Sequence, residues 1–244
     1  MVTKELATGV PIPEDVRSRF AFEARINEYM ARNPPPVAFA PLVATESGGS
    51  VMRFQAIEGH PIGPKWGARL PDAVLNELAD LASQLQAYAP FADWIPRYDP
   101  AAELARRLDE GVIDAEEFEQ VNAFVATHPW RRAFAHGDFT PRNVLASASG
   151  LVLIDWEFAG WYPIEYDRAF LWMVLGETPG ARASLEAAVP DGDRLSFWLC
   201  AYLIQRFHLG MWAKRGDSIT TRFPHHLETK RHVFTELLSA ADNA

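Results

Sequence analysis

Residues 135–170 constrain the fold of this 244-residue chain more than any other segment. Two short apolar runs, at 143–146 and 151–154, flank a turn at 147–150 that ends in glycine. Such a pattern is typical of an antiparallel hairpin. Asp138 and Asn143 come just before the first predicted strand, and Asp155 directly follows the second. The hairpin therefore brings three oxygen-bearing side chains to one end.

Three converging oxygen donors suit a hard divalent cation such as Mg²⁺. A carboxylate beside a metal-bound phosphate can also accept a proton from a hydroxyl group. Each residue alone has a plainer interpretation, in which Asp138 is a turn residue and Asn143 and Asp155 cap strand ends. The combination favours phosphate chemistry.

The motif H-x-D-x-x-x-x-N begins at His136, and I-D-W-E follows at 154–157. Together they resemble the catalytic core of the aminoglycoside phosphotransferase / choline kinase family, which shares the protein-kinase-like fold. The resemblance implies an α+β fold with a small N-lobe and a larger, mostly helical C-lobe. It also implies transfer of a phosphoryl group from ATP or GTP, bound with Mg²⁺, to an alcohol.

The resemblance assigns a role to each residue of the motif. Asp138 would be the catalytic base, and Asn143 and Asp155 would be the Mg²⁺ ligands. His136 would support the loop by packing and hydrogen bonding. Asp167, in the Tyr-Asp pair at 166–167, would brace the catalytic loop from behind.

The N-lobe of the family carries a strand lysine that pairs with a helix glutamate. Glu23 fits the glutamate, and Lys4, nineteen residues earlier, is the lysine placed for the strand, unless it belongs to a frayed terminus. The sequence contains no G-x-G-x-x-G, and only three residues precede Lys4, so we expect a shortened N-lobe without a glycine-rich loop. Arg142 could compensate by reaching the γ-phosphate, or could be a plain surface residue.

Residues 54–59 resemble the hinge between the lobes. Backbone groups of Gln55 and Ile57 would hydrogen-bond adenine beside Phe54. We therefore expect a reduced N-lobe at 1–59 and a C-lobe at 60–244 that carries the catalytic hairpin at 135–160.

Periodic apolar residues predict the helices, and a turn at 46–50 predicts a hairpin with strands at 37–43 and 51–57. The expected helices are 15–32, 71–88, 101–110, 114–127, 165–176, 181–188, 194–213 and 225–240.

Asp167 follows Asp155 by only twelve positions, which leaves no room for the activation segment and peptide platform of a protein kinase. We therefore expect a small-molecule acceptor.

The net charge of −9 favours a cationic acceptor, aminoglycoside-like ahead of choline-like. Acidic residues for it are Glu157, Glu177, Asp191, Asp193, Glu228 and Glu236. A choline-like amine would want an aromatic cage instead, which Trp198, Tyr202 and Trp212 could supply. Glu157 stays open between a second-metal or substrate role and a solvated carboxylate.

Composition excludes several other classes of protein and of site. The acidic net charge gives no footprint for nucleic acid, and a single cysteine excludes disulfide frameworks and cysteine-based zinc sites. We see no membrane segment and no signal peptide, and expect a cytoplasmic protein. The oligomeric state stays open. Two alternatives remain for function: a nucleotide-binding pseudokinase or regulatory module, and a fragment that binds no nucleotide.

Overall fold

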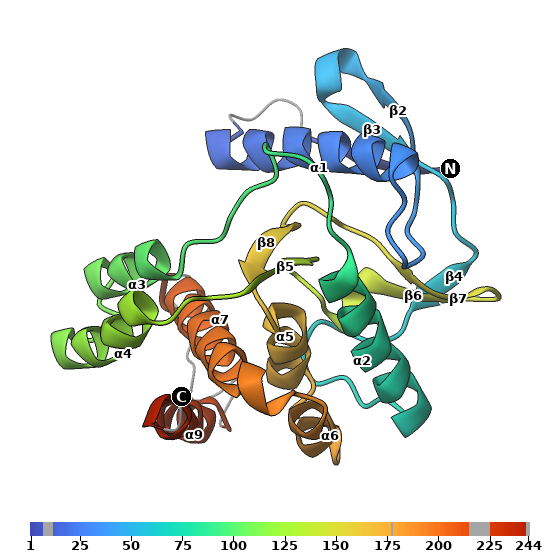
Figure 1. Cartoon of the computed structure of the whole chain (residues 1–244). Coiled ribbons are helices and arrows are strands. Elements are labelled where there is room, and N and C mark those ends of the chain that lie inside the picture. The colour runs from blue at the N-terminus through green and yellow to red at the C-terminus, as the bar shows by residue number, and fades with distance from the viewer. Residues whose placement is uncertain (7–11, 177, 215–224, 243–244) are drawn as a thin grey trace.

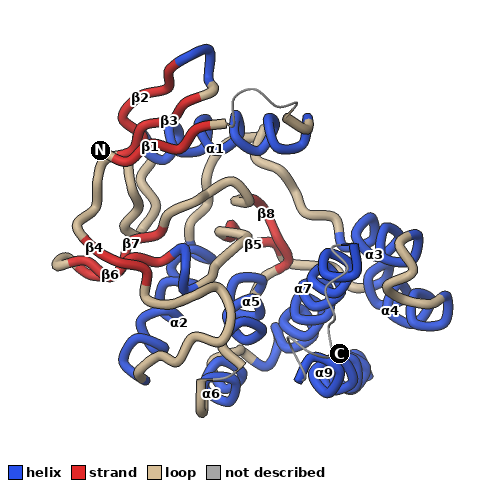
Figure 2. The backbone as a smooth tube through the Cα atoms, turned by 180° about the vertical axis from the view of Figure 1, so that it is seen from behind, coloured by secondary structure: helices blue, strands red, loops and turns tan. Residues whose placement is uncertain are grey.

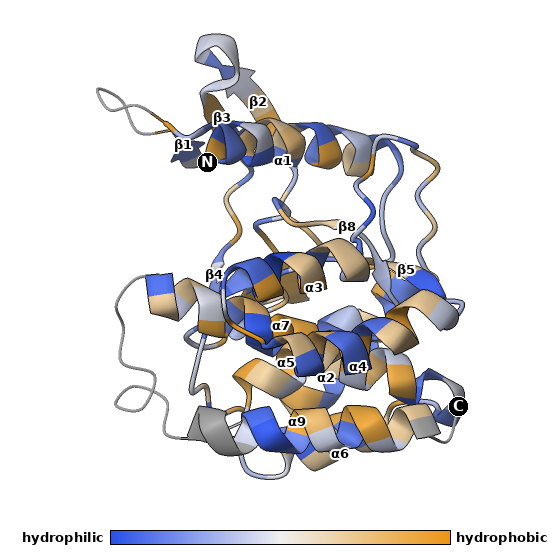
Figure 3. Cartoon of the chain, turned by 90° about the vertical axis from the view of Figure 1, so that its left-hand side faces the viewer, coloured by the Kyte–Doolittle hydropathy of each residue, from blue (hydrophilic) through white to orange (hydrophobic). Residues whose placement is uncertain are grey.

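Two lobes of unequal size make up the part of the chain that the computed structural model describes, residues 1–6, 12–176, 178–214 and 225–242. A helix and a small sheet lie on one side, and a larger, mostly helical body lies on the other (Figures 1 and 3). This confirms the predicted α+β fold of two lobes.

The small lobe consists of β1 (Val2–Glu5), α1 (Glu14–Arg32), β2 (Leu42–Glu46) and β3 (Val51–Phe54). The antiparallel strands are ordered β1-β3-β2, and Lys4 lies opposite Met52. α1 packs along β2, and its inner face carries Ile26 and Met30, both fully buried. Three prolines follow Asn33 and stop the helix, because proline cannot continue it.

The first predicted strand of the hairpin is misplaced, although the turn is correct. The turn is η1 (Ser47–Gly49), but β2 begins at 42 and not at 37. Residues 38–40 instead run beside β7 (Gly150–Leu153) of the large lobe. The Leu153 N–H donates to the Ala38 carbonyl (2.9 Å), and the Ala40 N–H donates to the Leu153 carbonyl (3.3 Å). The apolar run at 37–43 is thus divided between a contact with the large lobe and a strand of the small one.

The helices of the large lobe lie where the sequence predicts them, to within two residues at each end. They are α2 (Asp72–Ala87), α3 (Pro100–Asp109), α4 (Ala115–Thr127), α5 (Tyr166–Val174), α6 (Ala181–Ala187), α7 (Arg194–Lys214) and α9 (His225–Asp242). Every residue of α5 is buried, and α7 packs along it. Among the described residues, no helix is long and apolar enough to cross a membrane.

Two small sheets in the large lobe contain the strands of the segment at 132–163 (Figure 2). One has the order β4 (Gly59–Pro61), β6 (Val144–Ser147) and β7, and the other pairs β5 (Arg132–Ala135) with β8 (Gly160–Pro163). β6 and β7 form the hairpin that the sequence predicts. β4 begins at the last residue of the proposed hinge and pairs with β6, so Gly59–Pro61 join the sheet of the large lobe.

The segment between α2 and α3 runs back to the small lobe (Figure 1). Its Trp94 packs against α1. The Trp94 ring packs edge-on against Phe22 and Tyr29, with ring centroids 5.9 Å apart in both pairs. The Arg25 guanidinium lies over the same ring at 4.0 Å. This contact connects the helix of the small lobe to the large lobe.

Candidate active site

The loop between β5 and β6 is held from behind by Asp167, in the first turn of α5. Its carboxylate accepts the backbone N–H groups of His136 (2.7 Å) and Gly137 (3.0 Å). Burial raises the pKa of Asp167, and the hydrogen bonds from the two backbone N–H groups oppose that rise. Gly137 has a φ of 82°, and a Cβ there would lie 2.2 Å from the Phe158 carbonyl oxygen. Only glycine fits this position.

The fully buried ring of His136 connects the loop to the end of the hairpin. Its Nε2 donates to the Ile154 carbonyl (2.9 Å), and its Nδ1 accepts the Asp138 N–H (3.3 Å). The two contacts together fit the neutral imidazole with its proton on Nε2. The ring also packs on Trp156, with centroids 4.7 Å apart. His136 therefore lies where the predicted supporting role requires it.

Both carboxylate oxygens of Asp138 have partners. The Asn143 amide nitrogen donates to Asp138 Oδ2 and to the Asp138 carbonyl, each at 3.0 Å. The Lys65 ammonium lies 2.8 Å from Asp138 Oδ1. Two of the predicted residues, Asp138 and Asn143, are thus in direct contact, while Lys65 is an additional neighbour from a distant segment.

Asp155 is the second residue after the end of β7 and has a φ of 68°. A left-handed backbone is uncommon for a residue other than glycine, and aspartate tolerates it better than most. Such strained positions cluster at functional sites. The Asp155 carboxylate forms an ion pair with Lys4 of the small lobe.

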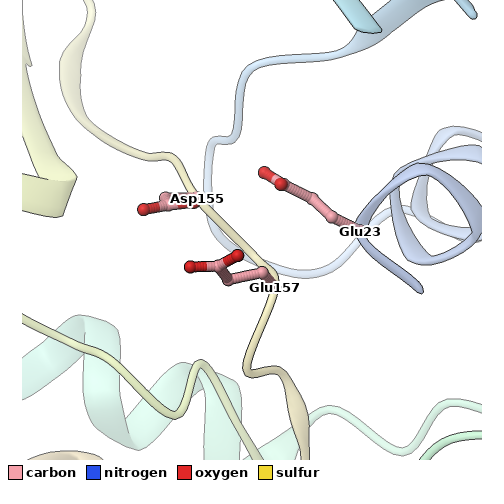
Figure 4. A group of neighbouring side chains, drawn as sticks. All are labelled: Glu23, Asp155 and Glu157. Carbon is pink, nitrogen blue, oxygen red and sulfur yellow. The ribbon is translucent and has the colours of Figure 1, made fainter. Parts of the chain in front are cut away.

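Lys4 bridges the two lobes through its ammonium group. The Nζ atom lies 2.6 Å from Glu23 Oε2 and 2.6 Å from Asp155 Oδ1, and 3.9 Å from Glu157 Oε2. Glu23, on α1, faces the segment that carries Asp155 and Glu157 (Figure 4). Because Lys4 lies on β1 and pairs with β3, the interpretation as a frayed terminus is wrong. The predicted pairing of Lys4 with Glu23 is present.

The charge state of this cluster follows from its burial. Burial raises the pKa of Glu23 to about 7; the Lys4 charge lowers it and the Asp155 and Glu157 charges raise it. Burial also raises the pKa of Glu157. Burial lowers the pKa of Lys4, but the charges of Glu23 and Asp155 outweigh that effect and raise it above its usual value. Lys4 therefore stays cationic between carboxylates.

The oxygen donors suit a hard cation. Ligand atoms of Glu23, Asp155 and Glu157 lie within 4.8 Å of one another. The hydrogen bonds of Asn143 to Asp138 use its amide nitrogen, which leaves Oδ1 as the atom for a cation. Carboxylate and amide oxygens are preferred ligands of Mg²⁺. Because Lys4 pairs with Glu23 and with Asp155 Oδ1, the donors that fit the metal suggested by the sequence are Asn143 Oδ1 and the second carboxylate oxygen of Asp155.

A pocket of about 420 Å³ opens between the lobes beside this cluster. It is lined by all the residues predicted to bind nucleotide or metal: Lys4, Glu23, Phe54, Gln55, Ile57, Arg142, Asn143 and Asp155. Arg142 is exposed at its edge. The pocket thus gathers residues that lie far apart in the sequence.

The hinge segment can use only part of its backbone for a nucleobase. The Gln55 N–H donates to the Pro41 carbonyl (2.9 Å), so the Gln55 carbonyl is the group left for a ligand. Within the described residues, the Ile57 N–H makes no backbone hydrogen bond. The hinge therefore presents a hydrogen-bond acceptor, the Gln55 carbonyl, and a donor, the Ile57 N–H, two residues apart.

Comparison with known proteins agrees with this geometry. The sequence model of the phosphotransferase enzyme family matches residues 10–198, more than three quarters of the chain. The chain belongs to this family. No curated protein matches the chain.

Solved structures of phosphotransferases and kinases share the fold at low sequence identity. A choline/ethanolamine kinase family protein from Mesorhizobium loti superposes with a TM-score of 0.66 and 16% identity, over 96% of this chain and 86% of that chain. The GDP and kanamycin complex of APH(2″)-IIIa gives 0.63 and 16%, over 98% and 93%. Macrolide 2′-phosphotransferase MphH from Brachybacterium faecium gives 0.59 and 20%, over 92% and 82%.

The aromatic cage predicted for this phosphotransferase does not form. Trp198 packs against Trp172 and His232 in the interior, and the Tyr202 hydroxyl donates to Glu117. Trp212 lies fourteen residues after Trp198 on α7, about 21 Å along the helix axis. The helical spacing is real, but neighbouring helices cover two of the three rings.

The acidic residues predicted to attract a cation do not gather at Asp138 either. Asp191 pairs with Arg194 and Asp193 pairs with Arg131, both at the N-terminal end of α7. Asp191 and Glu236 line a separate cavity of about 410 Å³. Glu177 and the Glu228 side chain lie outside the described residues. Only Glu157 of this set lies in the Lys4 cluster.

Asn27 and Lys65 escaped the sequence analysis, and Trp156 entered it only as part of the I-D-W-E motif. Asn27 lines the pocket and donates from its side chain to the Glu23 carbonyl (2.9 Å), and Trp156 lines the pocket behind Asp155. Asn27 follows Glu23 by one helical turn, a spacing that could have indicated it. Lys65 contacts Asp138 across 73 positions, and no local pattern announces such a contact.

Proposed function

We propose that this chain transfers the γ-phosphoryl group of a magnesium-bound nucleoside triphosphate, ATP or GTP, to a hydroxyl group of a small molecule. The observation that carries the proposal is that Asn143 and Asp155 line one pocket with the Lys4–Glu23 pair, and that Asn143 is hydrogen-bonded to the Asp138 carboxylate. Membership of the phosphotransferase enzyme family supports the same reaction class.

Each residue then has a defined part in the reaction. Asp138 accepts the proton of the acceptor hydroxyl, and the hydrogen bond from Asn143 anchors its carboxylate for this role. Lys4, held by Glu23, binds the nucleotide phosphates. Asn143 and Asp155 hold Mg²⁺, which when bound neutralises charge on the phosphates. The Gln55 carbonyl and the Ile57 N–H bind the nucleobase.

The acceptor is a small molecule, because the short interval between Asp155 and Asp167 has no room for a peptide platform. Similar structures are those of a kanamycin complex, a macrolide phosphotransferase and a choline/ethanolamine kinase family protein, which favours a hydroxyl-bearing small molecule. The net charge of −9 places an aminoglycoside-like cation first and a choline-like one second. The dispersal of the acidic residues weakens this ranking, so neutral and anionic alcohols belong in the same panel.

The test measures phosphoryl transfer from Mg·ATP and Mg·GTP to a panel of cationic, neutral and anionic alcohols. We expect Asp138→Asn to lower turnover on the order of 10²–10⁴-fold while nucleotide affinity is retained. Asp155→Ala should lose the Mg²⁺-dependent part of nucleotide affinity. Nucleotide binding without transfer to any acceptor or to water would instead indicate a regulatory nucleotide-binding module, and no nucleotide binding would overturn the proposal.

A further inference from the structure

Lys65 is the described cation in contact with the proposed catalytic base. Its Nζ lies 2.8 Å from Asp138 Oδ1, and its side chain is 32% exposed. The ammonium also lies 5.8 Å from the centre of the Phe170 ring on α5. Lys65 comes from the connection between β4 and α2, so the contact is made only in the folded chain.

The segment around Lys65 is fixed on both sides. Before it, the Ile62 N–H donates to the Val144 carbonyl (3.0 Å), and Gly63 lies so close to Ala68 and Pro141 that a Cβ would come within 2.9 Å and 3.4 Å of their Cβ atoms. Pro141 belongs to the catalytic loop itself. The segment that carries Lys65 therefore packs directly against the loop that carries Asp138.

After Lys65, the segment is held by α7 and by Thr178. The Trp66 ring packs on His208 (4.8 Å) and Trp212 (5.5 Å). The Thr178 hydroxyl donates to the Ala68 carbonyl at 2.6 Å. An anchored lysine loses less freedom when it binds an anion than a surface lysine does. The arrangement resembles a built site more than a chance surface pair.

The two oxygens of Asp138 are divided between neighbours. Asn143 uses Oδ2 and Lys65 uses Oδ1. A carboxylate oxygen has a second lone pair, so an acceptor hydroxyl can donate to Oδ1 beside the ammonium. The oxygen that attacks the phosphorus atom would then be a close neighbour of the Lys65 ammonium. Arg142, the cation within the catalytic loop, lines the nucleotide pocket instead.

We propose that Lys65 is a further catalytic residue, whose ammonium group binds the phosphoryl group while it is transferred. The proposal rests on the phosphotransferase function above. In the step, the hydroxyl proton moves to Asp138, the acceptor oxygen bonds to the γ-phosphorus, and the bond from that phosphorus to the β–γ bridging oxygen breaks. As Asp138 becomes neutral, Lys65 exchanges its carboxylate partner for phosphoryl oxygens. Cations directed at a transferring phosphoryl group stabilise its transition state.

The test uses binding of two probes, Mg·ADP (or Mg·GDP) and the same nucleotide with tetrafluoroaluminate, which mimics the phosphoryl group in transfer. We expect Lys65→Met to keep the affinity for Mg·ADP within about twofold and to weaken the tetrafluoroaluminate complex on the order of 10²-fold. Turnover should fall by a similar factor with an unchanged KM for the nucleotide, and Lys65→Arg should recover part of both. Arg69→Met is the matched control, because Arg69 is an exposed cation of the same segment.

The outcomes separate two failures. If the parent protein binds neither Mg·ADP nor Mg·GDP, the proposed function fails, and the role of Lys65 fails with it. If the parent binds the probes and Lys65→Met binds the tetrafluoroaluminate complex as tightly as the parent does, only the role of Lys65 is overturned. An equal loss of affinity for both probes, or the same loss in Arg69→Met, would reduce Lys65 to a structural partner of Asp138.

Discussion

Glu23 makes the stability of this protein depend on pH in a direction that can be measured. Its carboxyl group is 1% exposed and faces Lys4, Asp155 and Glu157. Burial raises its pKa from an ordinary 4.5 to about 7 in the folded chain. The folded state therefore binds this proton more tightly than the unfolded state does. The stability that Glu23 contributes is present below pH 4.5 and is lost as the pH rises through about 7.

The magnitude follows from the shift. One pKa unit corresponds to about 1.4 kcal/mol, so a rise from 4.5 to about 7 is worth about 3 kcal/mol. Glu23→Gln is nearly isosteric and cannot titrate, so it removes this dependence. The free energy of unfolding of the parent, minus that of Glu23→Gln, should fall by about 3 kcal/mol between pH 4.5 and pH 7.5.

The assay is urea unfolding of both proteins at half-unit pH steps, without Mg²⁺ and nucleotide. Glu28→Gln serves as the control, because it removes a carboxylate from the exposed face of the same helix. A difference that rises with pH, or one of the same size in both variants, would refute the argument from burial. A difference that rises with pH would mean that the Lys4 charge outweighs the loss of hydration at Glu23, and an equal change in both variants would mean that burial of Glu23 is not its cause.

Three further predictions concern the support of the site. Gly137→Ala forces a Cβ to within 2.2 Å of the Phe158 carbonyl oxygen at a positive φ, so we expect a loss of at least about 2 kcal/mol in thermal unfolding. Asp167→Asn turns an amide donor toward one of two backbone N–H groups and should cost about 1–3 kcal/mol, with turnover lowered more than nucleotide affinity in paired kinetic and binding assays. Trp94→Ala removes the contacts to α1 and should speed amide hydrogen exchange in that helix, with weaker nucleotide binding.

The helices could be predicted because their signals are local. In α2, Leu75, Leu78 and Leu85 recur on one face and are all buried. Asp99 accepts backbone N–H groups at the start of α3, and Asp114 does so at α4, as expected of capping residues. Such patterns need no knowledge of the rest of the chain.

The strands were harder, because their partners are distant in sequence. β4 has three residues and pairs with β6, more than eighty positions later. The run at 37–43 looks like one strand, yet its first part runs beside Leu153 of β7. A pattern of alternating residues does not say which neighbour a segment will meet.

In the candidate site, too, contacts within one local segment could be predicted from the sequence, whereas contacts between distant segments could not. The spacing of Asp138, Asn143 and Asp155 indicated their proximity, because a short hairpin joins them. The Lys65 contact with Asp138 depends on how two separate segments pack. The aromatic cage was wrongly predicted for a related reason. Helical spacing indicates that Trp198 lies on one face of α7, but it does not indicate which neighbouring helices cover that face.

The buried position of α5 has a consequence for how this protein can change. The helix has no surface toward solvent, and its first turn holds the loop that carries Asp138 through Asp167. We therefore expect a volume change around Trp172, which packs against Phe197 and Trp198, to alter the alignment of Asp138. In laboratory evolution, we expect suppressors of weakened catalytic-loop variants to arise in this interior.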